Sequence, residues 1–179
     1  MKENDSFSYF GVLQDFESLL QLVNKFKDHD WLAYKERKKT GGIASAYSDT
    51  IPLIYNPKIR SNKPIYHQHY ESFAEHINNA LVAVNPHVGN LIATQAMLTR
   101  LQPKSIIKTH KDRGELTHAS HRIHLPIVTN DKCLFTIEHD QKNLKAGEIW
   151  MIDNTDRFHS VENGGDEHRI HLIVDAREI

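Results

Sequence analysis

The chain has 179 residues, which suits one domain large enough to bury a substantial core. Its 22 lysines and arginines nearly balance its 23 aspartates and glutamates, so no strong field favours a nucleic acid or an anionic membrane as partner. The single Cys133 excludes an intrachain disulfide, and we recognise neither a signal peptide nor an apolar run of the roughly 20 residues that span a bilayer. We expect one soluble domain, residues 1–179, in a reducing, cytoplasmic setting.

The first half of the sequence shows helical periodicity in two places. From Asp15 to about His29, apolar residues recur at three- and four-residue steps, which puts them on one face of a helix. The same spacing runs from about Ile65 to Val84, and we expect the following Asn-Pro pair, which includes Pro86, to end this helix. Between the helices, residues 50–55 look like a short strand. We expect residues 1–90 to supply helical support and a substrate region.

From Leu91 the apolar period changes to two, and turn residues separate the segments. This pattern predicts seven strands, at 91–101, 105–110, 122–129, 133–139, 148–153, 158–163 and 169–175. Together with the strand at 50–55 they suffice for a small jelly roll, and two helices with apolar stripes have to be buried against a sheet. The sequence therefore predicts an α+β fold with a double-stranded β-helix core at 91–179 and two N-terminal helices on one sheet.

The word His-Arg-Ile-His-Leu occurs twice, at residues 121–125 and 168–172, each time in a predicted strand. In each copy the arginine and the second histidine are two residues apart, so they share one strand face while isoleucine and leucine take the other. Two amphipathic strands can converge on the same letters by chance. We interpret both words as facing one polar site inside a barrel.

His110 and Asp112 lie two residues apart at the end of a predicted strand, so both side chains can reach one metal ion. Taken alone, the pair is weak evidence, because a solvated turn would show the same residues. His159 opens a later strand and could complete a set of two histidines and one carboxylate. Such a set leaves three metal positions open and is typical of non-haem Fe(II) oxygenases.

Arg169 stands on the strand that follows His159. Its guanidinium can hold a carboxylate through two parallel hydrogen bonds, and the alternative role is a surface salt bridge. A metal site with a positioned arginine implies an acidic cosubstrate.

The residues between Met97 and Glu178 resemble the aspartyl/asparaginyl β-hydroxylase family of Fe(II)- and 2-oxoglutarate-dependent dioxygenases. Each matching segment is unspecific alone, but their combined pattern and order are specific. The segments are RLQPKSIIKTHKD, HRIHLPIVTN, LKAGEIWMIDN, FHSVEN and RIHLIVD. The resemblance reaches more weakly back to SDTIPLIY near Thr50.

The resemblance implies that His110, Asp112 and His159 bind iron and that Arg169 holds the distal carboxylate of 2-oxoglutarate. Fe(II), 2-oxoglutarate and O2 would then be the cofactor and cosubstrates. Because Asp112 is present, the chain is similar to the bacterial members, including proline hydroxylases, that keep the full triad of ligands.

Three further residues take roles from the same resemblance. Thr99 falls where the family has a hydroxyl residue that helps the arginine at the distal carboxylate. Arg122 and His124 match an Arg-x-His pair that approaches the other end of the cosubstrate.

The resemblance also implies the reaction and the substrate class. An aliphatic carbon would be hydroxylated with release of succinate and CO2, either in an Asp or Asn residue of a peptide or in a free amino acid such as proline. We expect a small amino acid or an amino-acid side chain in a cytoplasmic peptide as the partner. The segment Lys35 to Tyr47, which includes Gly41 and Gly42, is a candidate lid or substrate loop.

Two other functions remain open for the same residues. A cupin-like metalloenzyme could use the two histidines and Asp112 without 2-oxoglutarate, or bind zinc and activate a hydrolytic water. Against hydrolysis, no glutamate stands at a recognisable spacing to act as base. A non-catalytic binding or sensor domain could also keep the barrel, although an intact triad with Arg169 speaks against it.

Overall fold

The computed structural model describes residues 6–34, 48–56, 64–112, 120–153, 155 and 157–179. The candidate lid at 35–47 lies outside these residues. Within them, the larger of two sheets has seven strands in the order β1 (Phe7–Val12), β9 (Glu148–Ile152), β6 (His121–Val128), β11 (Arg169–Glu178), β4 (Leu91–Leu101), β2 (Ser48–Tyr55) and β3 (Ile65–Tyr66). The smaller sheet has four, in the order β5 (Ser105–His110), β10 (His159–Asn163), β7 (Cys133–Ile137) and β8 (Asp140–Lys142).

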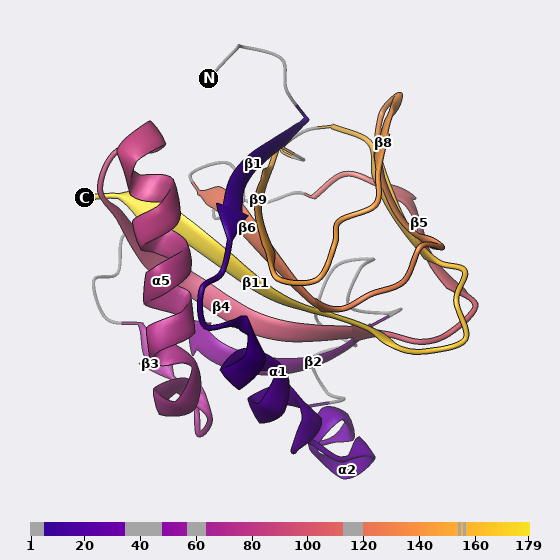
Figure 1. Ribbon diagram of the computed structural model, residues 1–179, viewed down its shortest axis with the longest axis horizontal. Helices are drawn as coiled ribbons and strands as arrows, with labels where there is room; N and C mark the ends of the chain where they lie inside the picture. Colours follow the sequence, from indigo (N-terminus) through magenta and orange to yellow (C-terminus); the bar gives the residue numbers. More distant parts are fainter. Residues whose placement is uncertain (1–5, 35–47, 57–63, 113–119, 154, 156) are drawn as a thin grey trace.

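All strand pairings in both sheets are antiparallel. Figure 1 shows the smaller sheet on the side of the larger sheet that the helices leave uncovered. A second apolar cluster, which contains Leu101, Phe135 and Trp150, joins strands of the two sheets. The predicted jelly-roll core is therefore confirmed, and its interior lies between the two sheets.

Three helices are described, namely α1 (Phe16–Asn24), α2 (Asp28–Leu32) and α5 (Tyr70–Val88). They lie against the larger sheet (Figure 1), where the apolar stripes of α1 and α5 join its main core cluster. Leu19 on α1 and Phe73 on α5 are almost fully buried there. None of the described helices combines the length and apolarity needed to cross a membrane.

Successive side chains of the central strands point to opposite faces of the larger sheet. One face packs into the core under the helices, and the other lines the interior of the jelly roll between the two sheets. On β11, Ile170, Leu172, Val174 and Ala176 belong to the core cluster under the helices. The residues between them therefore face the smaller sheet, as the two-residue period of a strand requires. On β6, Ile123 and Leu125 likewise belong to that core. The arginine and the second histidine of each His-Arg-Ile-His-Leu segment therefore lie inside the jelly roll; these residues are Arg122, His124, Arg169 and His171.

The helix bounds differ from the prediction at both ends of α5. The helix begins at Tyr70, because Ile65 and Tyr66 pair with β2 as strand β3. It continues through Pro86 to Val88, since a proline in the last turn removes a hydrogen bond only near the end of the helix. The turn ends at Gly89, whose N–H donates to the carbonyl of Asn85.

Strand β1 is an element that the sequence pattern did not predict. It pairs with β9 at the edge of the larger sheet, and its register shifts between Tyr9 and Val12, beside Gly11 with φ 106°. This irregularity interrupts the alternation that would have marked a strand. The first ninety residues therefore contribute strands β1, β2 and β3 as well as helices.

Candidate metal and cosubstrate site

A pocket with about 520 Å³ of empty space, counting the space open at its mouth, lies in the interior of the jelly roll. Apolar side chains from both sheets form part of its wall, including Leu101, Ile107 and Val161. All seven residues selected from the sequence line this one pocket, namely Thr99, His110, Asp112, Arg122, His124, His159 and Arg169.

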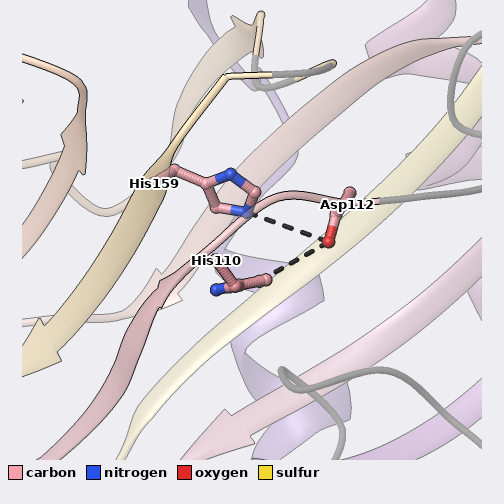
Figure 2. A group of neighbouring side chains, drawn as sticks. All are labelled: His110, Asp112 and His159. Atoms are coloured by element: carbon pink, nitrogen blue, oxygen red, sulfur yellow. Dashed lines mark ion pairs between the residues drawn. The ribbon is translucent and has the colours of Figure 1, made fainter.

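The three predicted metal ligands come together at the end of the smaller sheet. His110 ends β5 and pairs with His159, which opens β10, while Asp112 forms an isolated bridge with Thr155 just beyond. Oδ1 of Asp112 lies 3.5 Å from Nε2 of His110 and 3.8 Å from Nε2 of His159. Figure 2 marks both ion pairs with dashed lines. One ligand atom from each residue lies within 4.8 Å of the others.

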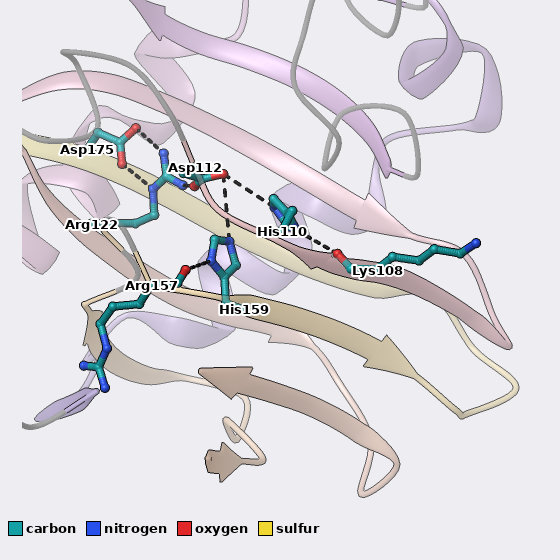
Figure 3. Close-up of polar contacts among 7 residues, drawn as sticks. All are labelled: Lys108, His110, Asp112, Arg122, Arg157, His159 and Asp175. Carbon is teal, nitrogen blue, oxygen red and sulfur yellow. Dashed lines mark hydrogen bonds and ion pairs between the residues drawn. The ribbon is translucent and has the colours of Figure 1, made fainter. Parts of the chain in front are cut away.

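Backbone carbonyls orient both imidazoles. Nδ1 of His110 lies 2.8 Å from the carbonyl oxygen of Lys108, and Nδ1 of His159 lies 3.0 Å from that of Arg157 (Figure 3). A carbonyl can only accept, so each Nδ1 donates and a neutral ring keeps its lone pair on Nε2. Nε2 of His110 is buried and makes no hydrogen bond to any described residue.

The charge states of Asp112 and His159 suit a divalent metal, and a bound cation would displace the proton that the Asp112 carboxylate favours on His110. Burial alone would raise the pKa of Asp112, but the contact with His110 and the charge of Arg122 lower it well below the ordinary value, so the carboxylate is ionised. Burial lowers the pKa of His159, whereas the Asp112 carboxylate raises that of His110. An ionised carboxylate with two Nε2 lone pairs is a donor set that fits Fe(II).

Arg122, which lines the pocket, contacts two carboxylates (Figure 3). Its Nε and Nη2 donate to the two oxygens of Asp175 at 2.7 and 3.0 Å, and its Nη1 donates to Oδ2 of Asp112. Asp175 was not among the residues predicted for the site. The available signal was its position on the same face of β11 as Arg169.

Arg169 belongs to a buried group with two neutral histidines. Its Nη2 donates to Nδ1 of His171 at 3.1 Å. Nδ1 of His124 lies 3.4 Å from Nδ1 of His171. Burial lowers the pKa of both histidines well below the ordinary value, helped by the positive charge of Arg169. Burial also lowers the pKa of Arg169 to about 10, so the guanidinium stays charged at neutral pH.

No carboxylate in the described part of the chain pairs with Arg169. A buried charge without an opposite charge is costly, so an anionic ligand bound in the pocket would stabilise this guanidinium. Thr99 lines the pocket with Arg169, and its strand neighbour across the sheet is His171. The sequence pattern places His171 on the polar face with Arg169 but gives it no role, and its Nδ1 accepts a hydrogen bond from that arginine.

A jelly roll whose interior brings His110, Asp112 and His159 together, in one pocket with a buried Arg169 that has no carboxylate partner among the described residues, is typical of non-haem iron oxygenases that use an acidic cosubstrate. The family model described as aspartyl/asparaginyl beta-hydroxylase matches residues 49–178, and the chain belongs to this family. It is accordingly an Fe(II)- and 2-oxoglutarate-dependent hydroxylase, with Fe(II) and 2-oxoglutarate as cofactor and cosubstrate.

Solved structures with the same fold come from bacteria and a virus. An oxidoreductase of the 2OG-Fe(II) oxygenase family from Burkholderia pseudomallei has a TM-score of 0.61 at 12% identity, over 93% of this chain and 91% of that one. A prolyl-4-hydroxylase from Pseudomonas putida gives 0.55 at 11%, over 97% and 93%. The viral collagen prolyl hydroxylase from Paramecium Bursaria Chlorella virus-1, in complex with 2-oxoglutarate, gives 0.59 at 7%, over 99% and 98%. At these identities the likeness shows the fold.

Proposed function

We propose that the protein hydroxylates an aliphatic carbon of a free amino acid or of an amino-acid side chain in a peptide. The family is named for aspartyl and asparaginyl residues, and two proteins of similar fold are prolyl hydroxylases, which supports a substrate of this class. One atom of O2 would enter the substrate and the other would enter succinate, as 2-oxoglutarate loses CO2.

The observation that carries the assignment of roles is the buried guanidinium of Arg169, without a carboxylate partner among the described residues, in the same pocket as the three predicted ligands. The three ligands would hold iron, which supplies the activation of O2 when bound. Arg169, with the hydroxyl of Thr99 nearby, would bind the distal carboxylate of 2-oxoglutarate.

The apolar wall contributed by Leu101, Ile107 and Val161 is suited to the methylene groups of this cosubstrate. It would also keep water from the reacting atoms. Arg122 and His124 would serve the end of the cosubstrate nearer the metal. In support, Nε2 of His124 is buried and makes no hydrogen bond within the described residues.

The test is anaerobic addition of Fe(II) and 2-oxoglutarate, which should produce a visible charge-transfer band. Admission of O2 should then release succinate, slowly without a substrate. Asp112→Ala should lose both signals because it removes one metal ligand. A folded wild-type protein that binds Fe(II) but gives neither signal would contradict the proposal and favour the cupin-like or non-catalytic alternative.

The substrate itself is found by measuring which compounds stimulate succinate release. Free amino acids, proline among them, should be compared with short peptides that contain Asp, Asn or Pro. The stimulating compound should gain one oxygen atom in the mass spectrum, and stimulation by none of these compounds would contradict the proposed substrate class. We also propose a cytoplasmic location, which the buried free thiol of Cys133 supports.

A further inference from the structure

Three charged side chains form a continuous chain beside the predicted metal ligands. Asp175 on β11 stands opposite Arg122 on the neighbouring strand β6. The bidentate contact between them leaves Nη1 of Arg122 to donate to Asp112. Figure 3 shows the guanidinium between the two carboxylates, with His110 and His159 on the far side of Asp112.

The two oxygens of Asp112 have different neighbours. Oδ2 accepts the hydrogen bond from Arg122, whereas Oδ1 faces Nε2 of His110 and Nε2 of His159. Arg122 therefore sets the rotation of the carboxylate and leaves one oxygen directed toward the two imidazoles. Hydrogen-bonding partners behind a metal ligand fix its orientation in this way.

Asp112 needs such a partner because of its position in the chain. Strand β5 ends at His110, and the strand pairing described for Asp112 beyond it is an isolated bridge to Thr155. Asp112 thus lies outside the regular pairing of β5 with β10 that places His110 opposite His159.

Arg122 can orient Asp112 only if its own guanidinium is fixed. An arginine side chain has many rotamers, and one hydrogen bond leaves the plane of the guanidinium free to turn. Two parallel bonds to Asp175 set both its position and its plane. Asp175 is itself 4% exposed, on a strand that pairs on both sides.

Asp175 also changes the balance of charge at Asp112. With two carboxylates beside it, Arg122 is neutralised without drawing the full charge of Asp112. The negative charge on Oδ1 is then available to a cation. Removal of the Asp175 charge would strengthen the competition of Arg122 for the metal ligand.

We infer that Asp175 is a positioning residue of the metal site, which acts through Arg122 to present Oδ1 of Asp112 to the metal. The inference rests on the proposed function, since it takes His110, Asp112 and His159 as the ligands. Asp175→Asn keeps the shape of the side chain but removes its charge and one acceptor oxygen. We expect the affinity for a divalent metal to fall about tenfold.

The test uses Co(II), added without oxygen to the full chain, because its visible ligand-field bands report the number and arrangement of ligands. Asp175→Asn should bind Co(II) more weakly and alter these bands. Asp175→Glu, which keeps the charge and both oxygens, should recover part of the affinity. Equal affinity and an unchanged spectrum in Asp175→Asn would overturn the inference.

Asp49 provides a matched control away from the metal ligands. It is 2% exposed, and its Oδ2 accepts hydrogen bonds from Nε and Nη2 of Arg100 at 3.2 and 3.0 Å. The remaining nitrogen of Arg100 donates to Asp28, which is not a predicted ligand. Asp49→Asn should lower the melting temperature as Asp175→Asn does, but leave Co(II) affinity and spectrum unchanged. Equal losses of Co(II) in the two variants would overturn the inference.

A second pair of variants covers the case in which Asp175→Asn alone does not fold, because the double variant removes both charges of the pair and leaves neither without its partner. If Asp175 acts through Arg122, Arg122→Leu and the double variant Arg122→Leu/Asp175→Asn should bind Co(II) equally. A further loss in the double variant would overturn the inference. If the wild-type protein binds no Co(II), the proposed function and this inference are both overturned. If Co(II) affinity is the same with and without the Asp175 carboxylate, this inference alone is overturned.

Discussion

Arg169 is a charged side chain that the described fold buries without an opposite charge. We expect Arg169→Leu to weaken 2-oxoglutarate binding by about 2–5 kcal/mol, the usual loss when one partner of a buried charged pair is removed. The same change should leave the ligand-free protein as stable as the wild type or more so, because it removes an uncompensated charge. Calorimetric titration with 2-oxoglutarate and urea unfolding measure the two effects.

The opposite pattern would contradict this role. If Arg169→Leu lowers the free energy of unfolding strongly but leaves 2-oxoglutarate affinity unchanged, the arginine is structural. Thr99→Val should weaken 2-oxoglutarate binding less than Arg169→Leu does, because it removes only a hydroxyl from the same pocket and keeps the size of the side chain.

His124 and His171 make stability depend on pH. Burial holds the pKa of both well below 6.5 in the folded protein, while the unfolded chain takes up protons near that pH. The unfolded state therefore binds more protons below pH 6.5, and stability falls as the pH drops, by about 1.4 kcal/mol per pH unit for each histidine. His171→Gln should flatten this slope in urea unfolding of the metal-free protein.

The exposed His139 supplies the control for this measurement. His139→Gln should leave the slope as in the wild type. A wild-type stability that stays constant between about pH 7 and 5 would contradict the burial of two neutral histidines.

At this scale, strand alternation made the pocket residues predictable. Once 122, 124 and 169 are placed on strands, their shared face follows from the two-residue period. The pairing of Arg122 with Asp175 was not predictable, because it depends on the register between β6 and β11. A shift of one residue would put a different side chain opposite the arginine.

The end of helix α5 depends on a backbone conformation that only glycine adopts easily. Gly89 has φ 99° and ψ 178°, and a Cβ there would contact only the side chain of Glu178, at an ordinary 3.7 Å or more. The cost of Gly89→Ala is therefore conformational, about 1–3 kcal/mol, measured by urea unfolding. Succinate formation should be unchanged because Gly89 does not line the pocket. Unchanged stability would contradict the described helix end.

The predicted elements were most accurate where the two-residue period was regular. The seven strands from β4 to β11 that the pattern predicted are all present. The segment predicted as one helix from Asp15 to about His29 instead forms α1 and α2, separated around Lys25 to Lys27. β3 and β8 have only two and three residues, too few to establish a period.

For the whole molecule, ligand binding and stability are linked by mass action. A ligand that binds only the folded state at 100 times its dissociation constant adds about 2.7 kcal/mol to the free energy of unfolding. We expect Mn(II), as an inactive stand-in, together with 2-oxoglutarate to raise the melting temperature, and a chelator to reverse the effect. The metal-dependent rise should be lost in Asp112→Ala, and an equal rise in that variant would contradict the assigned ligands.

The jelly-roll class followed from the number and length of the strands, whereas their order in the sheets did not. β6 and β4 are separated by β11, and β1 joins the opposite end of the sheet from β2. β11 and its neighbours β6 and β4, like β1 and its neighbour β9, lie far apart in the chain. Local sequence patterns carry no information on which distant strands pair.

Because β11 is central in the larger sheet, this sheet can be completed only after β11 has been synthesised. It lies between β6 and β4, and it is the last of the described strands to leave the ribosome. Until then the larger sheet is in two parts, and Arg122 lacks the carboxylate that faces it. The nascent chain thus exposes two unfinished sheet edges that other strands can occupy, so its folding depends on the time between translation of β4 and of β11.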